Sequence, residues 1–140
     1  MHENPILIVD DSPVCLRILE HHLRDAGYWV ISVGSGKEAW RLLQDHNQHY
    51  SMVMIDRLMM DMSGAALIKA IKSQPHLRAM PLVMLTGQAD PEEYIQAISA
   101  GVFDFLYKPI HPSLLLHVVK KAMESVARGQ VRKQQTKLQA

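Results

Sequence analysis

The stretch MVMIDRLMMDMSG, residues 52–64, joins a continuous apolar run to a carboxylate that directly follows it. Short continuous apolar runs are typical of strands buried on both faces of a parallel sheet. We therefore expect residues 52–55 to form such a strand, with Asp56 at its carboxyl end. Ser63 and Gly64 indicate that a helix starts soon after this strand.

Similar apolar runs recur along the chain, and helix signals separate them. Residues 6–9, 82–85 and 102–106 are continuous, whereas residues 29–33 are more mixed and suit a strand nearer the sheet edge. The expected helix starts are Ser12 with Pro13, Ser35, Ser63, Asp90 with Pro91, and Pro112 or Ser113. The second helix should run to about His46. Gly27 and Gly101 should end the first and fourth helices.

The strict alternation of strand and helix predicts an α/β fold of the (βα)5 type. Its five strands would form one doubly wound parallel sheet with helices on both faces. The inward stripe of the first helix is expected at Cys15, Ile18, Leu19 and Leu23.

Composition excludes several classes of protein. The 140 residues suffice for one domain, and 48% hydrophobic with 21% charged residues is globular composition. Neither a secretory signal nor an apolar run of the ~20 residues that span a bilayer is present, so we expect a cytoplasmic protein without a membrane partner. Cys15 is the only cysteine, which excludes a disulfide framework or a cysteine-based zinc site within one chain.

The net charge of +1 hides an asymmetry. Residues 120–140 hold six basic residues against one acidic residue, a net +5, so the remaining residues sum to −4. A slightly acidic body with a basic tail is not the pattern of a nucleic-acid-binding domain, so we expect no direct nucleic acid partner. The basic tail is interpreted as a solvated helix face.

Polar residues follow the apolar runs where a doubly wound sheet places its ligand crevice. These residues are Asp10, Asp11, Asp56, Thr86 and Lys108. Three converging carboxylates repel one another and favour a hard cation such as Mg²⁺ or Mn²⁺. An ammonium group and a hydroxyl group opposite them could hold the oxygens of a phosphoryl group. The residues therefore predict phosphoryl transfer to or from an aspartate.

Four motifs in this order resemble the receiver domain of bacterial response regulators. They are ILIVDD (6–11), MIDRLMMDMSG (54–64), VMLTG (83–87) and DFLYKP (104–109). The resemblance covers roughly residues 5–125 and implies the strand order 2-1-3-4-5. It also implies a signalling switch, rather than an enzyme with other substrates, that a sensor histidine kinase or a phosphotransfer protein phosphorylates.

The resemblance assigns roles to the residues that follow the strands. It makes Asp56 the phosphoacceptor, and it places Mg²⁺ on Asp10, Asp11, Asp56 and the backbone carbonyl of Leu58.

The same resemblance makes Thr86 and Lys108 the residues that bind the phosphoryl group, and makes Thr86 and Phe105 the switch pair. Thr86 could instead cap a loop, and Phe105 could instead be ordinary core. Pro109 would follow a cis peptide bond. Tyr107 is expected to point to the opposite face of its strand from Phe105.

Leu58 and Gln88 occupy the two positions that tune dephosphorylation in this family. Since an apolar side chain cannot orient an attacking water, we expect the phosphoryl group on Asp56 to be long-lived. Leu58 also disfavours a phosphatase of the aspartyl-phosphate type, which would need an acid at this position. A receiver-fold module that binds partners without phosphorylation is the alternative function.

The chain is expected to divide into a receiver domain, residues 1–127, and a helical extension or linker, residues 128–140. An output domain C-terminal to residue 140 would explain the linker-like composition of this segment. A homodimer through the fourth and fifth helices is compatible with the sequence.

Overall fold

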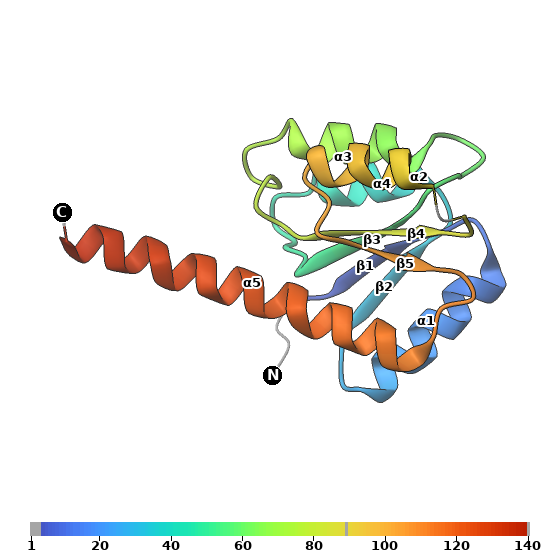
Figure 1. Ribbon diagram of the computed structural model, residues 1–140, viewed down its shortest axis with the longest axis horizontal. Helices are drawn as coiled ribbons and strands as arrows, with labels where there is room; N and C mark the ends of the chain where they lie inside the picture. Colours follow the sequence, from blue (N-terminus) through green and yellow to red (C-terminus); the bar gives the residue numbers. More distant parts are fainter. Residues whose placement is uncertain (1–3, 89, 140) are drawn as a thin grey trace.

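The computed structural model describes residues 4–88 and 90–139, without the side chains of residues 129–139. Strands and helices alternate along this part of the chain (Figure 1). The strands are β1 (Ile6–Val9), β2 (Val30–Val33), β3 (Met52–Asp56), β4 (Leu82–Thr86) and β5 (Asp104–Tyr107). The helices are α1 (Pro13–Asp25), α2 (Gly36–Leu43), α3 (Gly64–Lys72), α4 (Pro91–Ser99) and α5 (Pro112–Gln139).

The strands form one parallel sheet in the order β2-β1-β3-β4-β5. Helices α2, α3 and α4 lie on one face of this sheet, and α1 and α5 lie on the other (Figure 1). The predicted (βα)5 fold, its doubly wound arrangement and its strand order are confirmed.

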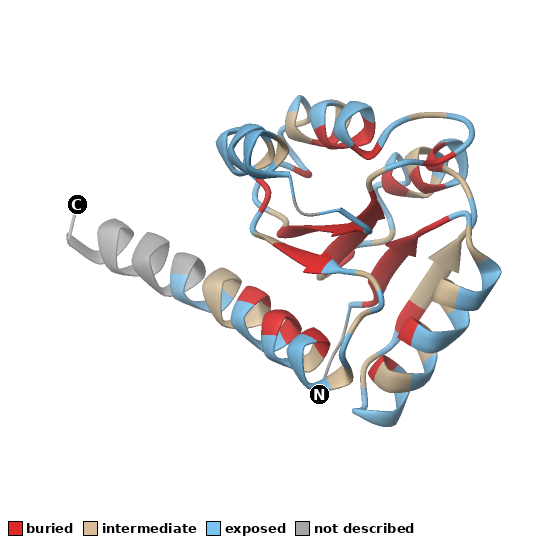
Figure 2. Ribbon diagram, turned by 45° about the vertical axis from the view of Figure 1, so that its right-hand side comes forward, coloured by how far each residue is buried: buried red, intermediate tan, exposed pale blue. Residues whose placement is uncertain are grey.

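The core consists of two apolar layers, one on each face of the sheet. Successive strand residues point to opposite faces, so Leu7 joins the layer under α2 and α3, and Ile8 joins the layer under α1 and α5. Both side chains are fully buried, as is most of β1, β3 and β4 (Figure 2). The central strands are therefore covered on both sides, which explains their continuous apolar sequences.

The predicted helix caps are present. The side chains of the four cap residues accept hydrogen bonds from first-turn backbone N–H groups at 3.0 to 3.3 Å. These residues are Ser12, Ser35, Ser63 and Asp90. Gly27 and Gly101 follow α1 and α4 with φ of 93° and 101°, a left-handed conformation that favours glycine.

Three local expectations are wrong. β5 begins at Asp104 instead of residue 102, because the N–H of Val102 donates to Ala97 O and closes the end of α4. Helix α2 ends at Leu43, three residues before the expected end. Ile18 is 46% exposed, because the sheet covers only the narrower stripe of α1 that contains Leu19.

The last helix, α5, continues from Pro112 to Gln139. The proposed boundary after residue 127 stays a prediction, and the side chains of the basic tail beyond Arg128 lie outside the described part. No described helix combines the length and apolar character that crossing a membrane would require.

The loop between β3 and α3 returns tightly onto the end of β3. Gly64 donates its N–H to Arg57 O at 2.8 Å, and a Cβ atom on Gly64 would lie 2.5 Å from Asp56 O. That neighbour is backbone, so it cannot move aside as a flexible side chain could. Gly64 therefore allows α3 to start directly beside Asp56.

We predict that Gly64→Ala destabilises the fold by about 1–3 kcal/mol, because the added methyl group overpacks a rigid contact. Gly34→Ala is the matched control, since Gly34 is exposed and an added Cβ atom there meets no atom within 4 Å. Chemical denaturation of both variants measures the difference. Equal stability of the two variants would contradict the close approach at Gly64.

Candidate functional site

Four strands deliver polar side chains to one edge of the sheet. Asp10 directly follows β1, Asp56 ends β3, Thr86 ends β4, and Lys108 directly follows β5. These four strands are adjacent and parallel, so their carboxyl ends meet at the same edge. The structure thus brings residues that are far apart in sequence into one crevice.

Asp10, Asp11 and Asp56 form an acidic cluster at this edge. One carboxylate oxygen from each residue lies within 4.8 Å of the others. Asp10 is fully buried and Asp56 is 7% exposed, whereas Asp11 is open to solvent. A donor set made only of carboxylate oxygens, with one side open to water, fits a hard divalent cation such as Mg²⁺.

The ammonium group of Lys108 lies against the two buried carboxylates. Its Nζ atom is 2.7 Å from Asp10 Oδ2 and 3.1 Å from Asp56 Oδ1. The backbone N–H of Lys108 donates to Thr86 O at 2.7 Å, which fixes the end of β5 against β4. The peptide bond between Lys108 and Pro109 is cis, the form that the family resemblance implies.

Burial and charge shift the pKa values of these groups. Burial, followed by repulsion from Asp10, raises the pKa of Asp56 and outweighs the opposing effect of Lys108. Burial lowers the pKa of Lys108, but the close carboxylates of Asp10 and Asp56 outweigh burial, so its pKa is raised and it stays charged. Burial and the neighbouring Asp10 raise the pKa of Cys15 to about 12, which leaves a protonated, unreactive thiol.

Backbone N–H groups hold the carboxylates that line the crevice. Asp10 Oδ1 accepts from the N–H of Ser12 at 2.9 Å. Asp11 Oδ2 accepts from the N–H of Met60 at 3.1 Å, which ties the loop after β1 to the loop after β3.

Leu58 lies in the loop after β3, two residues beyond Asp56. Its backbone forms an isolated antiparallel bridge with Ser63, and its side chain is 64% exposed. An apolar side chain is thus exposed to solvent two residues beyond Asp56. The role of the Leu58 carbonyl as a metal ligand stays a prediction.

The hydroxyl group of Thr86 is engaged with its own loop. Thr86 Oγ1 donates to Gln88 O and accepts from the N–H of Gln88, both at 3.2 Å. In this state of the protein, Thr86 therefore acts as a loop cap, one of the two roles that its sequence position allows. To donate to a phosphoryl oxygen, the hydroxyl would have to give up its hydrogen bond to Gln88 O.

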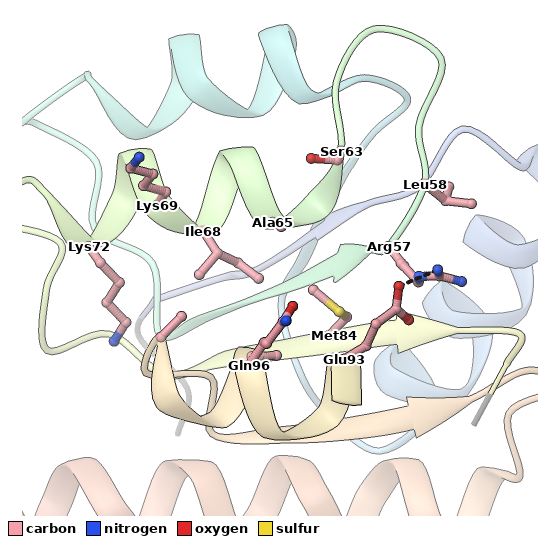
Figure 3. Close-up of a pocket in the computed structure, with 12 residues that line it drawn as sticks. Arg57, Leu58, Ser63, Ala65, Ile68, Lys69, Lys72, Met84, Glu93 and Gln96 are labelled. Atoms are coloured by element: carbon pink, nitrogen blue, oxygen red, sulfur yellow. Dashed lines mark hydrogen bonds and ion pairs between the residues drawn. The ribbon is translucent and has the colours of Figure 1, made fainter. Parts of the chain in front are cut away.

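Sequence reasoning missed Arg57, which links the site to α4. Its guanidinium group forms an ion pair with Glu93 in the first turn of α4 (Figure 3). It also donates to Gln88 Oε1 at 3.3 Å. The position of Arg57 directly after Asp56 was the available signal. Its partners are more than 30 residues away in sequence, however, so no local pattern could reveal the pairing.

Phe105 lies in the layer of core between the sheet and α4. It is 7% exposed, and its ring centroid is 5.1 Å from that of Tyr94 and 6.3 Å from that of Tyr107. The expectation that Tyr107 points away from Phe105 is wrong, because residues two apart on a strand share a face. An exposed tyrosine and a buried phenylalanine therefore stand side by side on β5.

Comparison with known proteins agrees with this geometry. A family model described as "Response regulator receiver domain" matches residues 6–120. The chain is 36% identical to the two-component response regulator ORR3 of Oryza sativa subsp. indica over 79% of its length and 84% of that protein. It is 34% identical to the chemotaxis protein CheY1 of Helicobacter pylori, over 79% of this chain and 89% of that one. The solved structure of the chemotaxis response regulator CheY4 of Vibrio cholerae is similar with a TM-score of 0.79 at 30% identity, covering 85% of this chain and 98% of that one.

We predict that Asp56→Asn raises the melting temperature at pH 7 in metal-free buffer. The pKa of Asp56 is raised in the folded state. The contribution of Asp56 to the stability of the fold is therefore fully present below the unfolded-state pKa of about 3.9 and is lost as the pH rises through the folded-state pKa. Ionised Asp56 therefore opposes folding at neutral pH, and asparagine removes that cost. Melting curves between pH 3 and pH 8 should show the gain disappear in acid.

Asp61→Asn is the control with the opposite sign. Asp61 accepts from the N–H groups of Lys37 and Gly36 at the start of α2, and the Lys37 hydrogen bond lowers its pKa most. Its stabilising effect is present above the unfolded-state pKa and is lost as the pH falls through the folded-state pKa. The control should therefore melt below wild type at pH 7. A change of melting temperature with the same sign in both variants would refute the opposite pKa shifts of Asp56 and Asp61.

Proposed function

The chain belongs to the response regulator receiver family, and we propose that Asp56 is the residue on which this phosphorylation-controlled switch accepts its phosphoryl group. One observation carries the proposal: Asp56 belongs to an acidic cluster that opens to solvent at Asp11, and it contacts the partly buried ammonium group of Lys108. Lys108 Nζ is 3.1 Å from one of its oxygens, and Asp10 and Asp11 stand within 4.8 Å. A carboxylate beside an ammonium group and a cluster that could hold a cation is suited to attack phosphorus, because the positive charges would stabilise the phosphoryl oxygens in the transition state.

The phosphoryl donor would be the phosphohistidine of a sensor histidine kinase or of a phosphotransfer protein. A carboxylate oxygen of Asp56 forms the new P–O bond while the P–N bond to the donor histidine breaks, and the imidazole leaves. The product is an acyl phosphate. Receivers catalyse this step by position and charge, which agrees with a site made of carboxylates and one ammonium group.

Asp10, Asp11, Asp56 and the carbonyl of Leu58 would hold Mg²⁺. The bound cation would neutralise phosphoryl oxygens and relieve the repulsion within the acidic cluster. Lys108 would pair with another phosphoryl oxygen. Deep burial of Asp10 suits it to position the cation rather than to contact the donor.

The hydroxyl of Thr86 would donate to the new phosphoryl oxygen in place of Gln88 O. The surface that changes with phosphorylation and binds partners would be the face built by α4, β5 and α5, beside Phe105. This face exposes large apolar side chains, namely Tyr94, Ile95, Ile98, Tyr107 and Leu114. A partner or a second copy that prefers one state of this face would shift the population of the two states.

We predict that incubation with Mg²⁺ and acetyl phosphate adds one phosphoryl group to the chain. Asp56→Asn should abolish the addition, because it removes the attacking carboxylate. Chelation of Mg²⁺ by EDTA should suppress it as well. Intact mass spectrometry measures the product.

Asp61→Asn is the matched control for this experiment. Asp61 lies in the loop that follows β3, and its carboxylate accepts from the first N–H groups of α2 instead of belonging to the acidic cluster. This variant should be labelled as wild type is. A phosphoryl group on Asp56→Asn would refute Asp56 as the acceptor.

We predict that Leu58→Asn speeds loss of the phosphoryl group by about tenfold or more, because an amide beside the acyl phosphate can orient an attacking water. Leu58 is 64% exposed, so the substitution should leave the fold intact. Decay of the labelled protein after removal of acetyl phosphate gives the rate.

Met60→Asn controls for polarity of the loop, since Met60 is 95% exposed and lies two residues farther along. Its decay rate should equal that of wild type. Equal rates for Leu58→Asn and wild type would show that Leu58 does not set the lifetime.

A further inference from the structure

A groove of about 570 Å³ lies between α3 and α4, on the face of the sheet away from α1 and α5 (Figure 3). Its size falls within the range of ordinary small-molecule sites. Each helix contributes residues spaced by three, four and seven positions, which is one face of a helix. The α3 wall is Ala65, Ile68, Lys69 and Lys72, and the α4 wall is Glu93, Gln96, Ala97 and the C-cap residue Ala100.

Small side chains explain why the groove is open. Alanines line both walls, and no residue of α4 is buried, so this helix packs loosely on the fold. The inner surface is apolar, because Ile68 of the α3 wall and Met84 of β4 are both almost fully buried. A ligand with an apolar body could therefore replace water over this inner surface.

The charges around the groove favour an anion. Its lining holds three cationic side chains, Arg57, Lys69 and Lys72, against one carboxylate, Glu93. Glu93 is already paired with Arg57 at one end of the groove. Two positive charges thus remain unbalanced within the lining.

Lys72 is the cation that suits a ligand. Figure 3 shows its side chain reaching from α3 toward α4, whereas that of Lys69 points away from α4. Its Nζ atom donates to the neutral carbonyl of Arg78 at 3.0 Å, and no carboxylate in the described part of the chain forms an ion pair with it. Burial lowers the pKa of Lys72, which means that its charged form lacks compensation.

We propose that this groove binds a small amphiphilic carboxylate, with its apolar body over Ile68 and Met84 and its carboxylate on Lys72. The site is separate from the phosphoacceptor crevice, although Arg57 and Leu58 line one end of it. Lys72 and Met84 are not residues of the acidic cluster, so binding can be tested in the unphosphorylated chain.

The test is an NMR titration of the full chain with 4-phenylbutanoate. The amide signals of groove residues such as Ile68 and Ala97 should shift and saturate. The neutral 4-phenylbutanamide has the same body without the charge, and acetate has the charge without the body. Both should bind at least about fivefold more weakly, because a partly buried ion pair and the apolar burial each contribute.

Variants locate the site. Lys72→Gln should weaken binding of 4-phenylbutanoate by about fivefold, whereas Lys120→Gln, which changes an exposed lysine of α5 on the other side of the sheet, should not. Ala65→Leu and Ala97→Leu should both block the groove from opposite walls. Ala65 is exposed, so its variant should keep the wild-type spectrum elsewhere.

Three results would overturn the proposal. Equal binding of the amide and the carboxylate would exclude an anion site. Unchanged binding in both leucine variants would place the ligand elsewhere. Shifts of the groove signals with protein concentration alone would show that a second copy of the chain occupies the groove.

Discussion

The crowding of three carboxylates at one edge of a parallel sheet is the constraint on which the rest of the structure depends. Parallel strands must end at the same edge, so Asp10 and Asp56 are brought together by the topology itself. Burial makes their repulsion costly, and the raised pKa of Asp56 reports that cost. Lys108 offsets part of it from the end of β5, and a divalent cation on the open side would offset more. The site is thus suited to take up positive charge and a phosphoryl group.

The loops around the acidic cluster connect it to the helices through hydrogen bonds and close contacts. Met60 donates to Asp11, and Asp61 in the same loop accepts from the first N–H groups of α2. Gly64 starts α3 against the backbone of Asp56. By contrast, α4 has no buried residue and is attached near the site through the Arg57–Glu93 ion pair. Elements with few buried apolar contacts are the ones that move at low cost, so α4 is the helix most suited to respond.

The sequence predicted features set by local rules or by pattern. Continuous apolar runs located the strands, and serine or aspartate residues located the helix starts, because burial on both faces and N-capping leave direct marks on composition. The convergence of Asp10, Asp56 and Lys108 followed from the positions of the strand ends. Features that depend on how helices sit on the sheet left no such mark. Val102 is a buried apolar residue like those of the strands, but its N–H donates to Ala97 O at the end of α4, so it precedes β5. The pairing of Arg57 with Glu93 likewise depends on where α4 lies on the sheet.

The hydrogen bonds of Thr86 suggest how the acidic cluster and α4 are coupled. Its hydroxyl binds the backbone of Gln88, whose side chain accepts from Arg57, and Arg57 is paired with Glu93 on α4. A phosphoryl group on Asp56 would compete with Gln88 O for the proton of that hydroxyl, and Gln88 O would lose its donor. The loop after β4 would then favour a different conformation, and the ion pair would carry the change to α4. The free energy that couples the acidic cluster to α4 can be no larger than the difference in these interactions between the phosphorylated and unphosphorylated states. Because α4 is loosely packed, a few hydrogen bonds are enough to decide its position.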